Sequence, residues 1–388
     1  MQPIGLNVNV TFLVCLVLFL AARPKLRVLV AGAVAGACLG AHLGLHGNVV
    51  HKALQALSYW GAGAIPAVWL MPLLREKSDL KLLGKLLFPP CFGILAAQFL
   101  GLGSHGATYD HFLYAFDGSL GFQPSFWAGR MVMSTPWTSL VTGALYDALP
   151  LFLAIAYLIE ERRGAVRARN VFFLILLVGL CGAACFFVFP AVGAYWLFAQ
   201  SFPLHPPALA EIALAPTMIA AVVPRNCMPS LHTSWALVVF WAAGRCSWPW
   251  RMALRALLAI MLLQTLAYHY LADMIVAVPF TLTLFAITQT GVPWRSWRRM
   301  GAAGFGLASV AVWLVALRWG TPLFQASPMV PWSAALVTTL VGWRLWRGLD
   351  RAAAGQTVNT PVALPELRLA RLDFKERPSL SDAGAIPE

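Results

Sequence analysis

The stretch RNCMPSLHTSWALVVFWAAG (residues 225–244) places polar and titratable side chains directly before an apolar run. Pro229 and Ser230 are residue types that begin helices. The run that starts here is long enough to cross a hydrocarbon layer of about 30 Å. Similar runs recur along the chain, whose 388 residues are 60% hydrophobic and 11% charged, against about 25% charged in a soluble domain. The sequence therefore predicts an all-α, polytopic membrane protein.

The apolar runs divide the chain into about eleven expected transmembrane helices. The first run is not preceded by a basic region, and Arg23, Lys25 and Arg27 follow it, which indicates an uncleaved span rather than a signal peptide. The expected spans are residues 8–22, 28–46, 56–74, 86–103, 136–159, 170–190, 231–249, 252–268, 270–290, 303–317 and 329–346.

The net charge of +13 follows this topology rather than indicating a nucleic-acid partner. When connections are assigned to alternate sides, one side receives only four of the 28 Lys and Arg residues, Lys52, Arg130, Arg225 and Arg318. Positive residues collect on the cytoplasmic side of membrane proteins. We therefore expect an N-terminus outside, a cytoplasmic C-terminus and long outer loops at 104–135 and 191–230.

Three titratable residues are expected to meet on the outer side. His232 begins the span at 231–249, and His269 and Asp273 begin the span at 270–290. Residues at i and i+4 lie on one face of a helix, so Asp273 can accept a hydrogen bond from His269 and fix its tautomer. Both spans run inward, which brings the two histidines to the same surface.

This arrangement suits phosphoryl transfer. A helix N-terminus binds phosphate, and Ser230 adds a hydroxyl group at that end. His269 is the candidate nucleophile, and His232 the candidate acid and base. A bound phosphate also needs a cation, for which Arg225 is the best placed and Arg130 the second.

MPSLH (228–232) and HYLAD (269–273) resemble the second and third motifs, PSGH and H-x-x-x-D, of the type-2 phosphatidic acid phosphatase superfamily. Leu231 and the HY-x-x-D form look most like its inositol phosphorylceramide synthase branch, an inositolphosphotransferase. The resemblance implies a six-helix core with the site at the outer or lumenal surface. It assigns the phosphorylated nucleophile to His269, the orienting carboxylate to Asp273 and the acid/base to His232.

Two weaker resemblances and two departures accompany these motifs. The stretches YDHFLYAFDGSLGFQPSF (109–126) and FPAVGAYW (189–196) look like loops of the same branch, and they suggest lipid-groove contacts from Tyr109, Asp110, Tyr195 and Trp196. The superfamily's K-x6-R-P motif is missing. Leu262 and Leu263 stand where the family has Ser-Arg, which increases the weight on Arg225 and Arg130.

Other polar residues are given structural interpretations. His105, His111, Asp110 and Asp117 fit no strong metal-ligand spacing, and we expect a solvated loop there. Cys227 is the only cysteine outside the apolar runs. With no obvious loop partner, it is interpreted, like the others, as a small buried hydrophobic residue.

The predicted function is transfer of a phosphoryl headgroup from a phospholipid donor to a lipid alcohol acceptor, such as ceramide or a diacylglycerol-like lipid. No metal and no other cofactor is expected. The alternatives are a lipid phosphate or polyprenyl diphosphate phosphatase, and a non-catalytic transporter. A transporter predicts charges at mid-membrane, and the spans have almost none. The site would lie on the periplasmic or lumenal face.

These features divide the chain into four expected regions. Three N-terminal helices precede the catalytic core, and two further helices and a cytoplasmic, disordered tail follow it. The regions are residues 1–85, 86–290, 291–347 and 348–388.

Overall fold

The fold is that of a computed structural model. It describes residues 26–70 except 44, 46 and 47, residues 106–161, 165–219 and 225–356, and the single positions 13, 16, 20 and 223. The expected span at 86–103 and the chain beyond Gln356 lie outside the described residues, as does nearly all of the expected span at 8–22.

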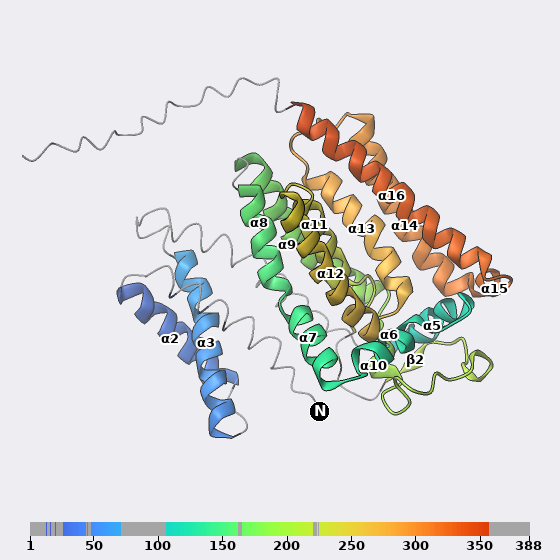
Figure 1. Cartoon of the computed structure of the whole chain (residues 1–388), viewed down its shortest axis with the longest axis horizontal. Coiled ribbons are helices and arrows are strands. Elements are labelled where there is room, and N and C mark those ends of the chain that lie inside the picture. Colours follow the sequence, from blue (N-terminus) through green and yellow to red (C-terminus); the bar gives the residue numbers. More distant parts are fainter. Residues whose placement is uncertain are drawn as a thin grey trace, which may run out of the picture.

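The described part is almost entirely helical (Figure 1). Its elements, in chain order, are α2 (Leu26–Leu43), α3 (Val49–Leu70), β1 (Ala107–Thr108), α5 (Asp110–Ser119), α6 (Pro124–Val132), α7 (Pro136–Asp147), α8 (Leu149–Glu161), α9 (Ala165–Val188), α10 (Ala194–Leu197), the 3₁₀ turn η2 (Leu209–Glu211), β2 (Thr217–Met218), α11 (Leu231–Ala243), α12 (Trp248–Tyr268), α13 (Leu271–Thr288), α14 (Trp297–Trp319), α15 (Thr321–Gln325) and α16 (Met329–Gln356).

The helices are those of a multi-pass membrane protein. Within the described residues, α12, α13 and α14 are long and apolar enough to cross a bilayer. Shorter apolar helical segments lie at Leu26–Cys38, Phe173–Val188 and Leu231–Ala243. The expected total of eleven spans stays a prediction.

The outward faces of the last two long helices are apolar. Leu307 and Val312 of α14 and Leu340 of α16 are each more than 60% exposed. Trp297 and Trp319, also largely exposed, stand at the two ends of α14, where indole rings anchor a helix at the membrane interfaces. An apolar belt between two indoles is the surface expected of a helix in lipid.

Three helix boundaries differ from those expected. The segment predicted as one span at 136–159 forms α7 and α8, which meet at Ala148. Pro150 explains the break, because proline has no N–H to continue the helical hydrogen bonds of α7. Helix α11 ends before Gly244 rather than at 249, and α16 continues to Gln356, past the expected end of its span.

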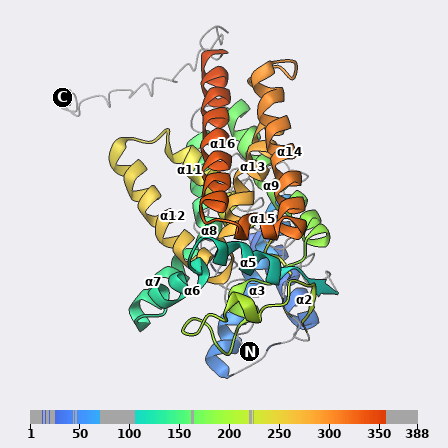
Figure 2. The same cartoon turned by 90° about the vertical axis from the view of Figure 1, so that its right-hand side faces the viewer.

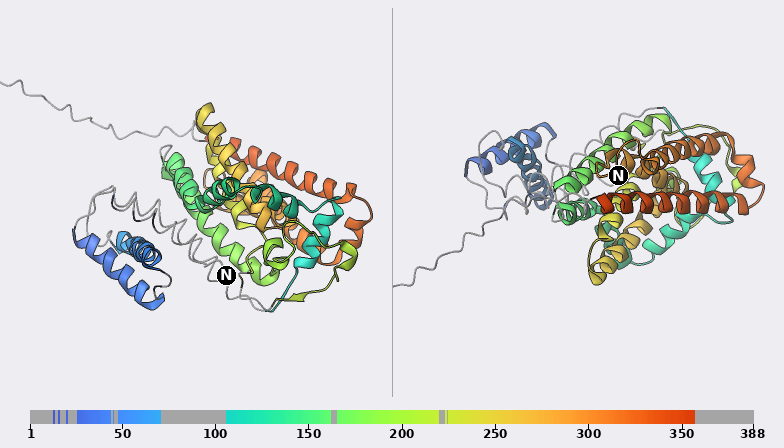
Figure 3. Two further views of the ribbon diagram at one scale, coloured as in Figure 1. Left: turned by 60° about the horizontal axis from the view of Figure 1, so that its bottom comes forward. Right: turned by 90° about the horizontal axis from the view of Figure 1, so that it is seen from above.

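The helices α2 and α3 form a closely packed pair, set beside the other helices in Figure 3. A Cβ atom added to Gly36 or Gly63 would overlap the backbone of the partner helix. Such close backbone approach at small residues is a common way for helices to associate in membranes.

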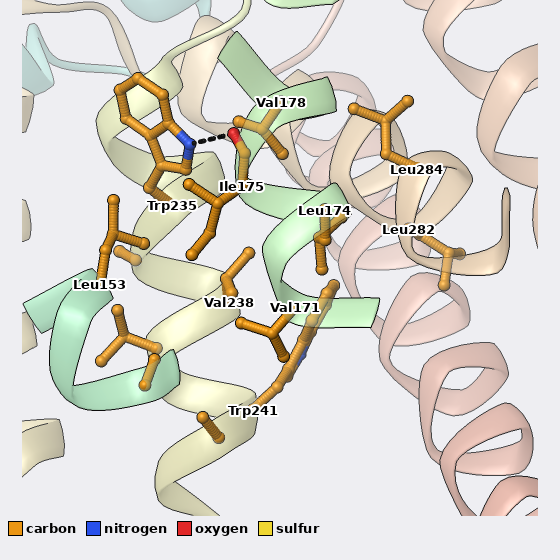
Figure 4. Close-up of a cluster of buried hydrophobic side chains, with 14 of the residues drawn as sticks. Leu153, Val171, Leu174, Ile175, Val178, Trp235, Val238, Trp241, Leu282 and Leu284 are labelled. Carbon is orange, nitrogen blue, oxygen red and sulfur yellow. Dashed lines mark hydrogen bonds between the residues drawn. The ribbon is translucent and has the colours of Figure 1, made fainter. Parts of the chain in front are cut away.

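Two buried clusters make up the core. The first lies among α8, α9, α11, α12, α13 and α16. In it Trp235 of α11 donates its indole N–H to the carbonyl of Ile175 at 3.2 Å (Figure 4). The second lies where α5 packs against α13, α14 and α15. Figure 2 shows α5, α6 and α15 together at one end of the bundle, here called the α5 end.

The loop at 104–135 is largely helical. It forms α5 and α6, and β1 pairs antiparallel with β2, so that Ala107 lies opposite Met218. His111 Nδ1 lies 2.9 Å from both the Ala213 carbonyl and the Thr217 hydroxyl. These contacts fasten the 198–218 segment to α5.

The far end of α13 is closed by Arg299 from α14. Its guanidinium donates to the carbonyl oxygens of Ala286, Ile287 and Val292 at 2.7–2.8 Å. The same group lies 4.0 Å from the centre of the Trp294 ring. The last carbonyls of a helix have no partner inside it, so this cation stabilises the C-terminal end of α13.

Candidate active site

His269 and Asp273 form a hydrogen-bonded pair at the α5 end. His269 Nδ1 lies 3.0 Å from Asp273 Oδ2, so the expected contact is present, although His269 is not on α13. It has extended backbone between α12 and α13. Asp273 Oδ1 accepts the Tyr270 N–H at 3.1 Å and caps α13. With Nδ1–H donated to the carboxylate, Nε2 carries the lone pair.

His232 lies beside this pair on the first turn of α11. Its ring stacks on Tyr146 of α7, with centroids 3.9 Å apart and an interplanar angle of 13°. The ring centroids of His232 and His269 are 6.3 Å apart. The two imidazoles are therefore close neighbours in this part of the fold.

Ser230 joins α11 to α13. Its hydroxyl oxygen accepts hydrogen bonds from the Thr233 N–H at 3.3 Å and the Thr233 hydroxyl at 3.0 Å. Its own N–H donates to the Asp273 carbonyl at 3.2 Å. Ser230 is therefore the N-cap of α11, and it fixes the His232 turn against the helix that carries Asp273.

Cys227 is a third member of the His269–Asp273 group. Its thiol donates to Asp273 Oδ2 at 2.7 Å, and its sulfur lies 3.1 Å from His269 Nδ1. The expectation that Cys227 is buried holds, but it is not an inert hydrophobic residue. Its place in the loop directly before MPSLH was the available signal.

Cys227, His269 and Asp273 are also the group in the described part of the chain whose donor atoms lie close enough to hold a metal ion, within 4.8 Å of one another. A metal would require the thiolate. Burial raises the pKa of the Cys227 thiol well above its ordinary value, and the Asp273 charge raises it further. The cluster therefore fits a hydrogen-bonded network with a protonated thiol better than a metal centre.

Asp117 holds the start of α13 from α5. Its carboxylate accepts the N–H groups of Leu271 at 2.8 Å and Ala272 at 3.1 Å. The side chain is completely buried. Burial raises the pKa of Asp117 from 3.8 to about 8, and the neighbouring Asp273 carboxylate contributes to the rise. The expectation that this aspartate is solvated was wrong.

Asp110 is the first residue of α5 and is also fully buried. It accepts the backbone N–H groups of Val192 at 3.1 Å and Gly193 at 2.8 Å. Burial raises its pKa above the ordinary 3.8. Asp110 is therefore not solvated either. It fixes the 189–193 loop, which belongs to one of the two weaker resemblances (189–196).

The 189–193 loop in turn touches the group formed by Cys227, His269 and Asp273. The Ala191 carbonyl accepts the Cys227 N–H at 3.0 Å. Gly193 has a φ of +91°, and a Cβ there would overlap the Tyr268 carbonyl and lie 3.3 Å from the Cys227 sulfur. Only glycine fits this approach without strain.

Aromatic rings surround the pair of histidines. Tyr268, next to His269, makes edge contacts with Tyr146 at 5.4 Å and with Tyr195 of α10 at 5.0 Å. Trp196 packs on Tyr195 and is 39% exposed. These rings form an aromatic wall beside His232 and His269.

The candidate cations are distributed unevenly. Arg225, two residues before Cys227, is buried, whereas Arg130 in the last turn of α6 is exposed. Arg318 of α14, which is far from MPSLH in the sequence, lies 4.6 Å from the centre of the Tyr109 ring. Tyr109 also packs on Phe189 at 4.9 Å. The fold thus brings an unexpected cation to this end of the bundle.

Comparison with known proteins gives one match. Residues 111–287 match the family model of the PAP2 superfamily. No curated protein and no solved structure matches the chain. The matched range contains His232, His269 and Asp273, together with Asp117 and Cys227. The chain therefore carries a PAP2 superfamily domain, of the group of membrane lipid phosphatases and phosphotransferases, over residues 111–287.

Proposed function

We propose that the protein is a membrane lipid phosphotransferase of the inositol phosphorylceramide synthase type. His269 Nε2 attacks the phosphorus of a phospholipid, a P–N bond forms, and the P–O bond to the departing lipid alcohol breaks. His232 gives that oxygen its proton. The acceptor alcohol then loses its proton to His232 and attacks the same phosphorus, which releases His269.

The observation that carries this proposal is that two histidines in different environments lie close together. His269 has one ring nitrogen occupied by Asp273, which leaves Nε2 as nucleophile. His232 has its ring held flat on Tyr146 at a centroid distance of 6.3 Å from His269. A nucleophile oriented by a carboxylate, with a second base across the site, is the arrangement that covalent catalysis requires.

The phosphate is proposed to sit at the start of α11. The first amides of α13 are already bonded to Asp117 and Asp273, so α11 supplies the helix end. Ser230 as the cap, with Arg225 and Arg130 as cations, complete the proposed phosphate site. Arg225 is the stronger candidate of the two because it lies on the same loop as Cys227, two residues before it.

A lipid alcohol rather than water is proposed as the acceptor. His269 is only 7% exposed, and Tyr146, Tyr195 and Tyr268 lie around the two histidines. An enclosed apolar site favours a lipid hydroxyl over water, because such a site excludes water from the reacting groups. Tyr109, Asp110, Tyr195 and Trp196 are the proposed groove residues, with Asp110 acting through the loop that it holds.

The test uses the purified protein with a phospholipid labelled at its phosphorus, with and without ceramide or diacylglycerol. We expect a new labelled lipid that depends on the acceptor; labelled inorganic phosphate or a labelled phosphomonoester alone would instead indicate a phosphatase. The His269→Ala variant should lose roughly 10³-fold or more in turnover. His205→Ala, in an exposed loop position, is the matched control. An active His269→Ala variant would refute the phosphohistidine step.

The site is further proposed to face the periplasm or a lumen, with the N-terminus outside and the C-terminus in the cytoplasm. A reporter fused after Gln200 should then be outside, and one fused after Arg163 inside. The opposite pattern would place the reaction in the cytoplasm.

A further inference from the structure

The carboxylate of Asp273 is divided between three donors. Oδ1 accepts the Tyr270 N–H at 3.1 Å. Oδ2 lies 3.0 Å from His269 Nδ1 and accepts the Cys227 thiol at 2.7 Å. Asp273 is completely buried, and Cys227 is 1% exposed. A buried carboxylate is stable only when its lone pairs are satisfied, and the thiol satisfies one of them.

The position of the thiol is fixed from outside the group. The Cys227 N–H bonds to the Ala191 carbonyl, and the Gly193 backbone closes over the sulfur. Asp110 holds that loop through the N–H groups of Val192 and Gly193. Cys227 is thus tied to α5 through the loop, while Asp273 is tied to α5 separately through Asp117 and the start of α13.

We propose that Cys227 is a positioning residue of the reaction, whose S–H group holds the Asp273 carboxylate in the rotamer that orients His269. This inference rests on the proposed function in one respect only, the role of His269. Rotation of the carboxylate about its Cβ–Cγ bond would take Oδ2 away from the imidazole. The thiol opposes this rotation because it holds Oδ2, which accepts no backbone N–H group among the described contacts.

The geometry separates this role from that of a second nucleophile. In a Cys–His–Asp nucleophilic triad the thiol and the carboxylate contact opposite nitrogens of the imidazole. Here the Cys227 sulfur and Asp273 Oδ2 both lie beside Nδ1 of His269. Nε2 is left for the substrate, and the buried thiol has no path to it.

Two substitutions distinguish positioning from packing. Cys227→Ser keeps a hydrogen-bond donor, whereas Cys227→Val keeps the approximate volume and apolar character but removes the donor. Positioning predicts that Ser retains kcat within about threefold while Val loses about tenfold or more, since hydrogen bonds to charged groups contribute most. KM should change little in both. Packing predicts the opposite order.

The pH profile supplies a second readout. Without the thiol, Oδ2 of Asp273 is no longer shared and holds the imidazole proton more strongly. The acidic limb of the rate profile should therefore move to higher pH in Cys227→Val but not in Cys227→Ser. The probe is the same phosphorus-labelled phospholipid with its lipid alcohol acceptor in mixed micelles, and Cys246→Ser is the matched control because Cys246 lies in the α11–α12 turn at the other end of α11.

Infrared spectroscopy tests the hydrogen bond without any substrate. S–H stretching bands lie in a region free of other protein bands and move to lower frequency when the thiol donates. The wild-type-minus-Cys227→Ser difference should show a band below the one that Cys246→Ser removes, and Asp273→Asn should move it upward. A Cys227 band at the frequency of the Cys246 band would overturn the inference and leave the proposed function intact. An active His269→Ala variant would overturn the proposed function and the positioning role that depends on it, but not the hydrogen bond from the Cys227 thiol to Asp273.

Discussion

Both ends of α13 are closed by an ionisable side chain from another helix, but the two ends are not equivalent. At the Thr288 end, Arg299 of α14 covers three carbonyl oxygens. At the Leu271 end, Asp117 of α5 covers two N–H groups. Arg299 carries the charge that the helix dipole favours at its end, whereas Asp117, with its pKa raised to about 8, carries the favoured charge only above that pH.

The difference lies in what each charge can do. Arginine stays protonated at all working pH values, so the Arg299 end is a fixed structural joint. Asp117 titrates, and it lies close to Asp273, which itself contacts Cys227 and His269. One end of α13 therefore only secures the helix, while the other secures the helix next to the candidate site.

Asp273→Asn is expected to have the largest effect. An asparagine at 273 that presents its NH₂ group to His269 imposes the wrong tautomer, as in other His–Asp pairs, where the loss is about 10⁴-fold. We expect turnover to fall by about 10³-fold or more, with a change of less than about 5 °C in the melting temperature in detergent. A loss of folding as large as the loss of activity would make the Asp273 contact mainly structural.

Arg299→Ala should do the reverse. It leaves three carbonyls without their donor and removes a cation from the negative end of α13, at a cost of about 3 kcal/mol. We expect a lower melting temperature and a nearly unchanged kcat in the protein that remains folded. Measuring both on the same preparation checks this, and a kcat loss similar to that of Asp273→Asn would abolish the distinction between the two ends.

Asp117→Asn tests the titration at the reactive end. Since burial raises the folded-state pKa to about 8, only the unfolded chain ionises between about pH 4 and pH 8. Relative stability therefore falls as pH rises through this window and levels off above it. The melting temperature of the wild type should show this slope, and that of Asp117→Asn should not. Parallel curves for the two proteins would refute the raised pKa.

Arg299→Lys should have the smallest effect. Lysine keeps the positive charge at the end of α13 but cannot span three carbonyls with a planar fork. We expect a loss of about 1 kcal/mol, seen as a shift of a few degrees in the melting temperature, and full activity. Stability equal to that of Arg299→Ala would show that hydrogen bonding, rather than charge, closes this end.

The long apolar helices were accessible from the sequence. Hydrophobic runs predicted α12, α13 and α14 within a few residues, and HYLAD predicted the His269–Asp273 contact. The break between α7 and α8 was missed because apolarity alone does not report the effect of Pro150. The helical nature of 110–132 was missed because these helices are short and their polar residues read as a loop.

The contacts that hold the candidate site in place could not be predicted from the sequence in the same way. Asp117 meets Leu271 across 154 residues of chain, and no local pattern encodes such a pairing. Asp110 was named among the groove candidates but interpreted as solvated, because burial of a carboxylate by backbone donors is visible only in the fold. Cys227 contacts Asp273, 46 residues later, and a lone cysteine gives no signal of its partner.

The two aspartates of α5 also set an order of assembly. During synthesis α5 is made long before α13, and until Leu271 arrives the Asp117 carboxylate has no backbone donors to replace its water. Burying an ionised Asp117 without these donors would cost several kcal/mol, so we expect α5 to dock only after the start of α13 has been made. Docking of α5 then joins the 189–193 loop to α13 in one event. The candidate site is consequently expected to be the last part of the domain to close.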